Sequence, residues 1–158
     1  MASSLSFAEF MELLPSEGGA PPLVSSGIGV DYVSDANPCF VEPSLSAGHP
    51  VRADTSVILL SAPGAVGKST VASELARRTH ATLWNLAQFQ VGSNTFTGTL
   101  TRAFGAASGA VLTGLASGKS LVVLDAIDEA AVRAGSQNRG GPIRLDSSRG
   151  LDKWILCG

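Results

Sequence analysis

Residues 60–70, LSAPGAVGKST, decide the fold of this chain, because they are either a phosphate-binding loop or a turn of small residues that contains a lysine. Four residues separate Ala62 from Gly67, and Lys68 and Ser69 follow directly. This is the spacing of a glycine-rich phosphate-binding loop, with alanine in place of the first glycine. Such a loop needs a strand before it and a helix after it, so the flanking residues determine which interpretation holds.

Both flanks have the required character. Residues 56–60, SVILL, are a short, continuously apolar run, which predicts a strand buried on both faces. Residues 68–80, KSTVASELARRTH, repeat apolar side chains at helical spacing through Val71, Leu75 and Ala76. The stretch therefore matches the Walker A motif in its predicted context as well as in its spacing.

The chemistry of the motif assigns a role to each residue type. Glycines let backbone N–H groups turn toward phosphate oxygens, Lys68 supplies a positive charge to the β and γ phosphates, and the Ser69 hydroxyl binds Mg²⁺. The N-terminus of the following helix favours the same anion. The predicted nucleotide-binding residues are Ala62, Pro63, Gly64, Ala65, Val66, Gly67, Lys68, Ser69 and Thr70.

The tetrapeptide SGKS occurs again at residues 117–120 and provides an internal comparison. There it follows a predicted helix and precedes a predicted strand, and Thr113 stands where the motif requires glycine or alanine. We therefore predict a turn at 117–120, without phosphate binding.

Residues 121–130, LVVLDAIDEA, supply the second half of a nucleotide site. An apolar run ending in Asp125 is typical of a Walker B strand, which presents a carboxylate at the edge of a parallel sheet where ligands bind. We expect Asp125 to hold Mg²⁺ through water opposite Ser69, and Glu129 to polarise the attacking water. Taken alone, these acidic residues together with Asp128 also suit a solvated helix N-terminus.

The remaining pattern predicts an α/β protein. Residues 4–14 form an expected helix with a Ser6–Glu9 capping box, and 15–54 form an irregular linker with one short strand near Gly29 to Val33. Further predicted elements are a strand at 81–86, a helix at 96–116 and a strand running into a helix at 120–134. Alternating strands and helices indicate a parallel sheet.

Composition narrows the function classes. Hydrophobic residues make up 44% of the 158 residues, charged residues 15%, and the net charge is −2, which gives no electrostatic signature for nucleic acid. The two cysteines, Cys39 and Cys157, lack metal-ligand spacing and are expected to be buried or idle thiols. No apolar run is long enough to span a membrane, and no signal peptide is evident, so we expect a cytoplasmic protein.

The segments APGAVGKST and LVVLDAIDEA resemble the P-loop NTPases in which a catalytic glutamate follows the Walker B aspartate. The spacing of Asp125, Asp128 and Glu129 is most similar to the NACHT or signal-transduction ATPase group. The resemblance covers residues 55–134 and implies a three-layer α/β/α fold with a mostly parallel sheet. It also implies ATP and Mg²⁺ as ligands, Glu129 and Lys68 as catalytic residues, and a nucleotide switch within a larger signalling or defence-type protein.

The sequence around this core departs from that family. We expect 1–54 to be a helix and linker, 55–134 the NTPase core, and 135–158 a flexible or incomplete segment of a truncated ATPase, whose sheet lacks strands. A strand at 143–146 with Ser148 and Arg149 as a sensor is the alternative for the tail. Partners could then be a homo-oligomer or missing C-terminal domains.

Two other functions remain open. A small-molecule kinase of the nucleoside- or shikimate-kinase type would use Arg139, Arg144 and Arg149 as a lid. A non-catalytic nucleotide-binding fragment is the other alternative. A GTPase is disfavoured, because residue 128 is aspartate where glycine would be required, and the guanine-reading Asn-Lys-x-Asp motif does not occur.

Overall fold

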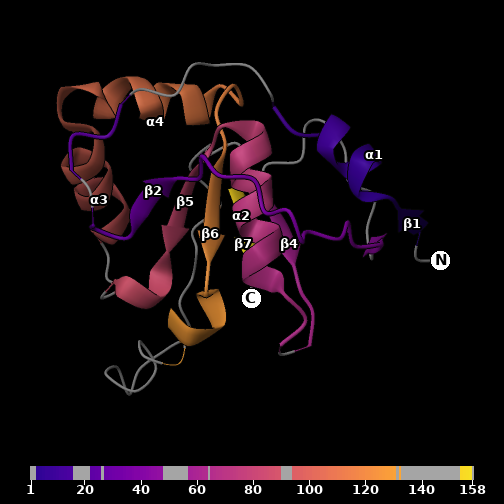
Figure 1. The fold of residues 1–158 in the computed structure, drawn as a ribbon. Helices are drawn as coiled ribbons and strands as arrows, with labels where there is room; N and C mark the ends of the chain where they lie inside the picture. Colours follow the sequence, from indigo (N-terminus) through magenta and orange to yellow (C-terminus); the bar gives the residue numbers. More distant parts are fainter. Residues whose placement is uncertain are drawn as a thin grey trace.

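The protein is described here by a computed structural model that defines residues 3–15, 22–25, 27–47, 57–63, 65–89, 94–130, 132 and 154–157. Its centre is a five-stranded sheet in the order β2-β5-β6-β7-β4 (Figure 1). The pairs β5–β6, β6–β7 and β7–β4 are parallel, and the edge strand β2 runs antiparallel to β5. The strands are β2 (Val30–Tyr32), β4 (Val57–Leu60), β5 (Thr82–Asn85), β6 (Val122–Asp125) and β7 (Trp154–Cys157).

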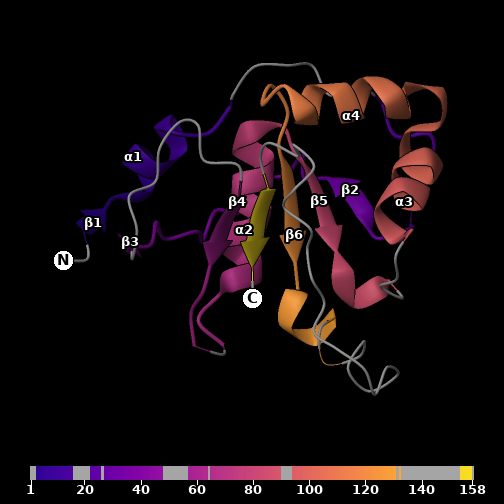
Figure 2. The ribbon, with the colours of Figure 1, turned by 180° about the vertical axis from the view of Figure 1, so that it is seen from behind.

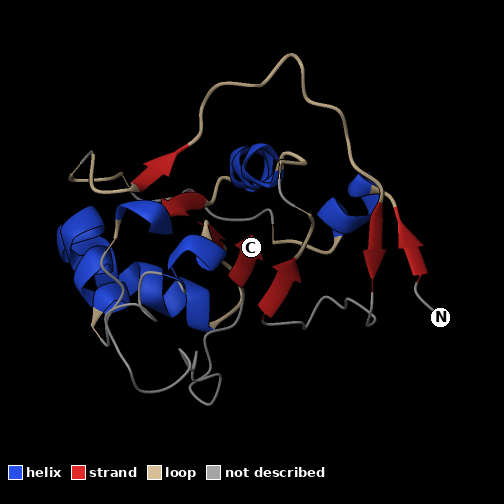
Figure 3. Ribbon diagram, turned by 90° about the horizontal axis from the view of Figure 1, so that it is seen from below, coloured by secondary structure: helices blue, strands red, loops and turns tan. Residues whose placement is uncertain are grey.

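Helices lie on both faces of this sheet (Figure 3). Helix α2 is on one face, together with the N-terminal helix α1, and α3 and α4 are on the other. The helices are α1 (Phe7–Glu12), α2 (Lys68–Thr79), α3 (Thr95–Phe104) and α4 (Ser108–Ala116), with short 3-10 turns η1 (Leu86–Gln88) and η2 (Gly105–Ala107). The expected α/β architecture with parallel central strands is therefore present.

Strand β7 lies between β4 and β6 (Figure 2), which the sequence did not indicate. Residues 135–158 were expected to be a flexible or incomplete segment, yet residues 154–157 pair with strands on both sides. The alternative strand at 143–146 and the lid and sensor arginines lie outside the described residues. The strand that carries the phosphate-loop motif is consequently joined to the rest of the sheet through β7.

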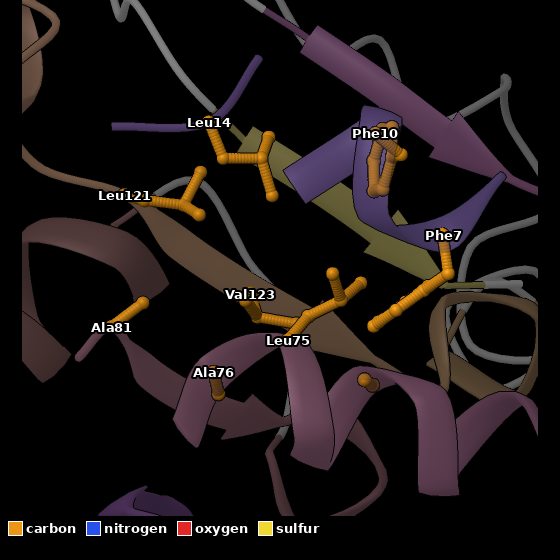
Figure 4. Close-up of a cluster of buried hydrophobic side chains, with 9 residues drawn as sticks. Phe7, Phe10, Leu14, Leu75, Ala76, Ala81, Leu121 and Val123 are labelled. Atoms are coloured by element: carbon orange, nitrogen blue, oxygen red, sulfur yellow. The ribbon is translucent and has the colours of Figure 1, made fainter. Parts of the chain in front are cut away.

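Alternation along β6 divides the core into two clusters. Leu121 and Val123 face α2 and α1, where Phe7, Phe10 and Leu75 complete a buried cluster (Figure 4). Val122 and Leu124 face the other way, among side chains of α3, α4 and β5. A strand buried on both faces reads as continuously apolar, which is why the sequence revealed β6 so clearly.

The N-terminal segment is more fully part of the fold than a linker would be. Helix α1 has the predicted capping box, in which Ser6 and Glu9 satisfy each other's backbone N–H groups. The predicted strand near Gly29 to Val33 is β2, and its Val30 is fully buried. Two strands that the sequence did not predict, β1 (Ser3–Leu5) and β3 (Leu45–Ala47), pair antiparallel as a small second sheet.

The chain between β2 and β3 crosses the outer side of α2 (Figures 1 and 3). Arg78 of α2 binds this segment, because its guanidinium donates to Glu42 at 2.8 Å. The same guanidinium lies over the rings of Phe7 and Phe40, 5.1 and 5.5 Å from their centroids. Cation–π contacts of this kind add to the burial of the two rings. Helix α2 is thus enclosed between the sheet and the N-terminal segment.

Two local expectations were wrong. Strand β4 is not buried on both faces, since it is an edge strand of the sheet and its Leu59 is 62% exposed. The single helix at 96–116 is two helices, because Gly105 takes φ 55° and ends α3. The turn predicted at the second SGKS is present, since residues 117–119 form a turn between α4 and β6, with Gly118 at φ 68°.

Candidate functional site

The loop between β4 and α2 contains two residues with left-handed backbone. Gly67 precedes the helix at φ 87° and ψ 26°, and Ala65 is also left-handed at φ 62°. A Cβ on Gly67 would meet no atom closer than 4.0 Å, so the dihedral angle and not space requires glycine there. Among the residues that the structure describes, no side chain caps the N-terminus of α2. The first N–H groups of this 12-residue helix are therefore directed toward the loop, where an anion could accept from them.

Lys68 folds back over this loop. Its Nζ donates to the carbonyl oxygen of Ala62 at 3.0 Å and lies 4.0 Å from Oδ2 of Asp128. The side chain is only 22% exposed, unlike a lysine that extends into solvent from a loop. A compact ammonium charge thus sits beside an uncapped helix N-terminus, and both favour an anion at the same place.

The acidic residues predicted from the second motif follow β6. Asp125 is the last residue of the strand and is 9% exposed, while Asp128 and Glu129 are exposed on the short helical stretch at 127–130. Ala126 has φ 63° and turns the chain between them. The backbone N–H of Glu129 donates to Oδ1 of Asp128 at 3.0 Å. The structure therefore separates a buried carboxylate from two solvent-facing ones.

The strand order brings these two motifs to one edge of the sheet. The loop after β4 and the turn after β6 lie at the same end of the sheet (Figure 1), because the two strands run in the same direction. With β7 between them, β4 and β6 are two strand spacings apart, about 9.5 Å. The contact between Lys68 and Asp128 shows that the two segments meet. The partner of Lys68 is Asp128, to which the sequence analysis assigned no specific role.

Sequence reasoning overlooked Asn85 at this edge. Asn85 is the last residue of β5 and lies in register with Asp125 of β6. Its Oδ1 accepts from the backbone N–H of Ala87 at 3.0 Å and so caps the turn η1. A polar residue at the carboxyl end of a parallel strand was the available signal. Asn85 therefore belongs to the polar rim of the candidate site.

The side chains suit a magnesium ion only in company with phosphate. Within the described ranges, no group of three or more His, Cys, Asp or Glu residues could hold a metal ion. Mg²⁺ is commonly bound through one or two protein oxygens together with substrate phosphates and water. The Ser69 hydroxyl and the Asp125 carboxylate are donors of that kind. By the chemistry of their oxygens alone, the two residues suit a metal ion that binds together with a polyphosphate.

A cleft adjoins the loop on the outer side of α2. It has a volume of about 240 Å³ and lies between the first two turns of the helix and the segment after β2. Its lining residues are Val33, Asp35, Asn37, Ser69, Thr70, Ser73 and Glu74. Ser69 and Thr70 thus belong to the cleft as well as to the motif. Gly64, one of the predicted loop residues, lies outside the described residues.

Comparisons with models of known families, with curated proteins and with solved structures give no match to this chain. The similarity to NACHT and signal-transduction ATPases therefore rests on the two sequence motifs. In the part of the chain that the structure defines, no helix has the length and apolarity needed to cross a membrane. Cys39, expected to be buried or idle, is an exposed free thiol.

Proposed function

We propose that this chain binds Mg-ATP at residues 62–70 and hydrolyses it, as the nucleotide switch of a larger cytoplasmic signalling or defence-type ATPase. The observation that carries the proposal is the position of Lys68. Its ammonium lies over a glycine-containing loop at an uncapped helix N-terminus, in contact with the acidic turn that follows β6. An anionic group entering this loop would meet the helix N–H groups and the ammonium together.

The proposed roles follow from position. Lys68 neutralises charge on the β and γ phosphates, and Ser69 and Asp125 hold the metal ion. Bound Mg²⁺ would neutralise the charge that develops on the phosphate oxygens. Glu129 is exposed one residue after Asp128, where it can accept a proton from a water molecule at the sheet edge. Burial of Asp125 and exposure of Glu129 suit a metal ligand and a water-activating base, respectively.

The test for binding uses the second SGKS as a matched control. A fluorescent ATP analogue is titrated into the wild type, Lys68→Ala and Lys119→Ala, with and without Mg²⁺. Loss of a charge-assisted contact should weaken binding by Lys68→Ala roughly 10- to 100-fold, while Lys119→Ala binds as the wild type does. Equal effects of the two substitutions, or none from either, would refute the proposed site.

Chemistry is tested separately with Glu129→Gln. This variant should bind Mg-ATP normally and hydrolyse it about 10²- to 10⁴-fold more slowly, as expected for loss of a general base. Loss of binding instead would place Glu129 in a structural role. Transfer of phosphate to an added small molecule, with hydrolysis absent, would favour the kinase alternative.

A further inference from the structure

The cleft beside the loop extends from the end of the motif along the outer side of α2. Its floor is the first two turns of α2, from Ser69 to Glu74, and its other wall is the segment that follows β2. Five residues of helix rise about 7.5 Å, so the cleft extends that far along α2 from the phosphate loop. At about 240 Å³ it is smaller than drug-sized sites, which begin at roughly 300 Å³.

Two polar side chains of the wall have complementary hydrogen-bonding ends. The amide oxygen of Asn37 accepts from the backbone N–H of Cys39 at 2.9 Å, and its NH₂ group is a hydrogen-bond donor. Asp35, two residues earlier, carries a carboxylate that accepts hydrogen bonds; one oxygen lies 3.3 Å from the Ser34 hydroxyl. The wall thus offers one acceptor and one donor.

The remaining acidic residue of the cleft does not oppose an anionic ligand strongly. Glu74 is 4% exposed, and its carboxylate accepts from the guanidinium groups of Arg77 and Arg78 at 2.6 to 3.1 Å. Its charge is therefore matched by two cations on the same helix. Ser73 adds a hydroxyl to the floor, and Val33 adds an apolar surface against which a flat ring could lie.

We propose that this cleft binds the nucleoside part of the nucleotide, with a ribose hydroxyl donating to Asp35 and an acceptor of the base edge receiving the NH₂ of Asn37. The inference rests on the proposed function, because Ser69 and Thr70 connect the cleft to the phosphate loop. It makes the site selective for ribonucleoside triphosphates over deoxyribonucleotides and over inorganic polyphosphate. Carboxylates recognise ribose hydroxyls in other nucleotide sites by the same chemistry.

The experiment measures binding by calorimetry on the whole chain with four ligands: Mg-ATP, its 2′-deoxy and 3′-deoxy forms, and Mg-tripolyphosphate. The variants are Asp35→Asn and Asn37→Asp, and both keep the size of the side chain. Asn37→Asp also keeps an oxygen that can accept from the backbone N–H of Cys39. Asp31→Asn, an exposed acid on β2, is the control. Urea unfolding of each variant verifies that it is folded.

The wild type should bind Mg-ATP at least 10-fold more tightly than Mg-tripolyphosphate, and at least one deoxy form should bind more weakly than ATP. Asp35→Asn and Asn37→Asp should each lose roughly 5- to 30-fold in ATP affinity and leave tripolyphosphate affinity unchanged. Asp35→Asn should also abolish the difference in affinity between ATP and whichever deoxy form binds the wild type more weakly.

Equal affinity for ATP and tripolyphosphate, with both still dependent on Lys68, would overturn the nucleoside site and leave the phosphate site standing. The same conclusion follows if Asp31→Asn weakens ATP binding as much as Asp35→Asn does. Absence of binding by every ligand would overturn the proposed function and this inference together.

Discussion

Replacing Glu74 with glutamine should lower the free energy of unfolding by about 2 to 3 kcal/mol at pH 7. Glu74 is buried on α2, beneath the segment that crosses the helix, and both of its oxygens accept from arginines. The pKa of Glu74 is lowered from 4.5 to about 2, mainly by the hydrogen bonds from Arg77. Burial raises this pKa, and the hydrogen bond from Arg78 lowers it further. Glutamine keeps the shape and one acceptor but loses the charge.

The magnitude follows from this pKa. A fall from 4.5 to about 2, at about 1.4 kcal/mol per unit, corresponds to roughly 3 kcal/mol of preference for the charged carboxylate in the folded chain. The two arginines are 28% and 29% exposed, so water screens part of the attraction and the lower end of the range is included.

The pH dependence has a definite sign. Because the folded-state pKa lies below the unfolded value, the stabilisation from Glu74 is complete above pH 4.5 and is lost as the pH falls toward 2. Urea unfolding of the wild type and Glu74→Gln at pH 7, 4.5 and 3 should therefore show a difference that shrinks below pH 4.5. A difference that stays constant over this range would refute the assigned cause.

Glu42→Gln is the matched control. The carboxylate of Glu42 accepts from the same Arg78 at 2.8 Å, and its side chain is 49% exposed. Exposed pairs contribute at most about 1 kcal/mol, so this variant should change stability much less than Glu74→Gln. Equal losses would show that burial of Glu74 does not matter.

Two further outcomes concern the sheet. Leu59→Lys, on the exposed face of edge strand β4, should reduce self-association in sedimentation measurements at increasing concentration. Val41→Lys, which changes an apolar residue that is 84% exposed in a loop, should not. Equal effects of the two substitutions would contradict a role for the sheet edge. Ile155→Pro should lower the free energy of unfolding by roughly 2 kcal/mol or more, because it removes a backbone N–H from a strand paired on both sides; an unchanged urea midpoint would contradict the central position of β7.

The elements that the sequence predicted correctly are those whose signal lies in contiguous residues. An apolar run before a glycine-rich turn identified β4 and α2, and the spacing of Ser6 and Glu9 identified the start of α1. Strand β6 was evident because its side chains are buried on both faces. Each of these signals comes from neighbours along the chain, so none requires knowledge of the tertiary structure.

The features that the sequence missed depend on contacts between distant segments. Residues 154–157 are as long as β4 and β6, but no recognisable motif follows them, and only pairing with β4 and β6 defines them as a strand. The pairing of Lys68 with Asp128 follows the turn at Ala126, which has a positive φ. An alanine in a sequence does not predict a positive φ, because alanine rarely adopts it. The cleft requires the segment after β2 to cross α2, which no local pattern encodes.

The place of β7 has a consequence for how the chain folds. Val57 of β4 pairs with Trp154 of β7, roughly 100 residues later, whereas β5 and β6 have closer partners along the chain. Closing so long a loop has a large entropic cost, so we expect the β5–β6 pair to form early and β4 to join the sheet late. The rate-limiting step of folding would then be the one that brings the loop after β4 to the acidic turn after β6. If the proposed site binds nucleotide, its affinity should accordingly develop only in the final kinetic phase of refolding.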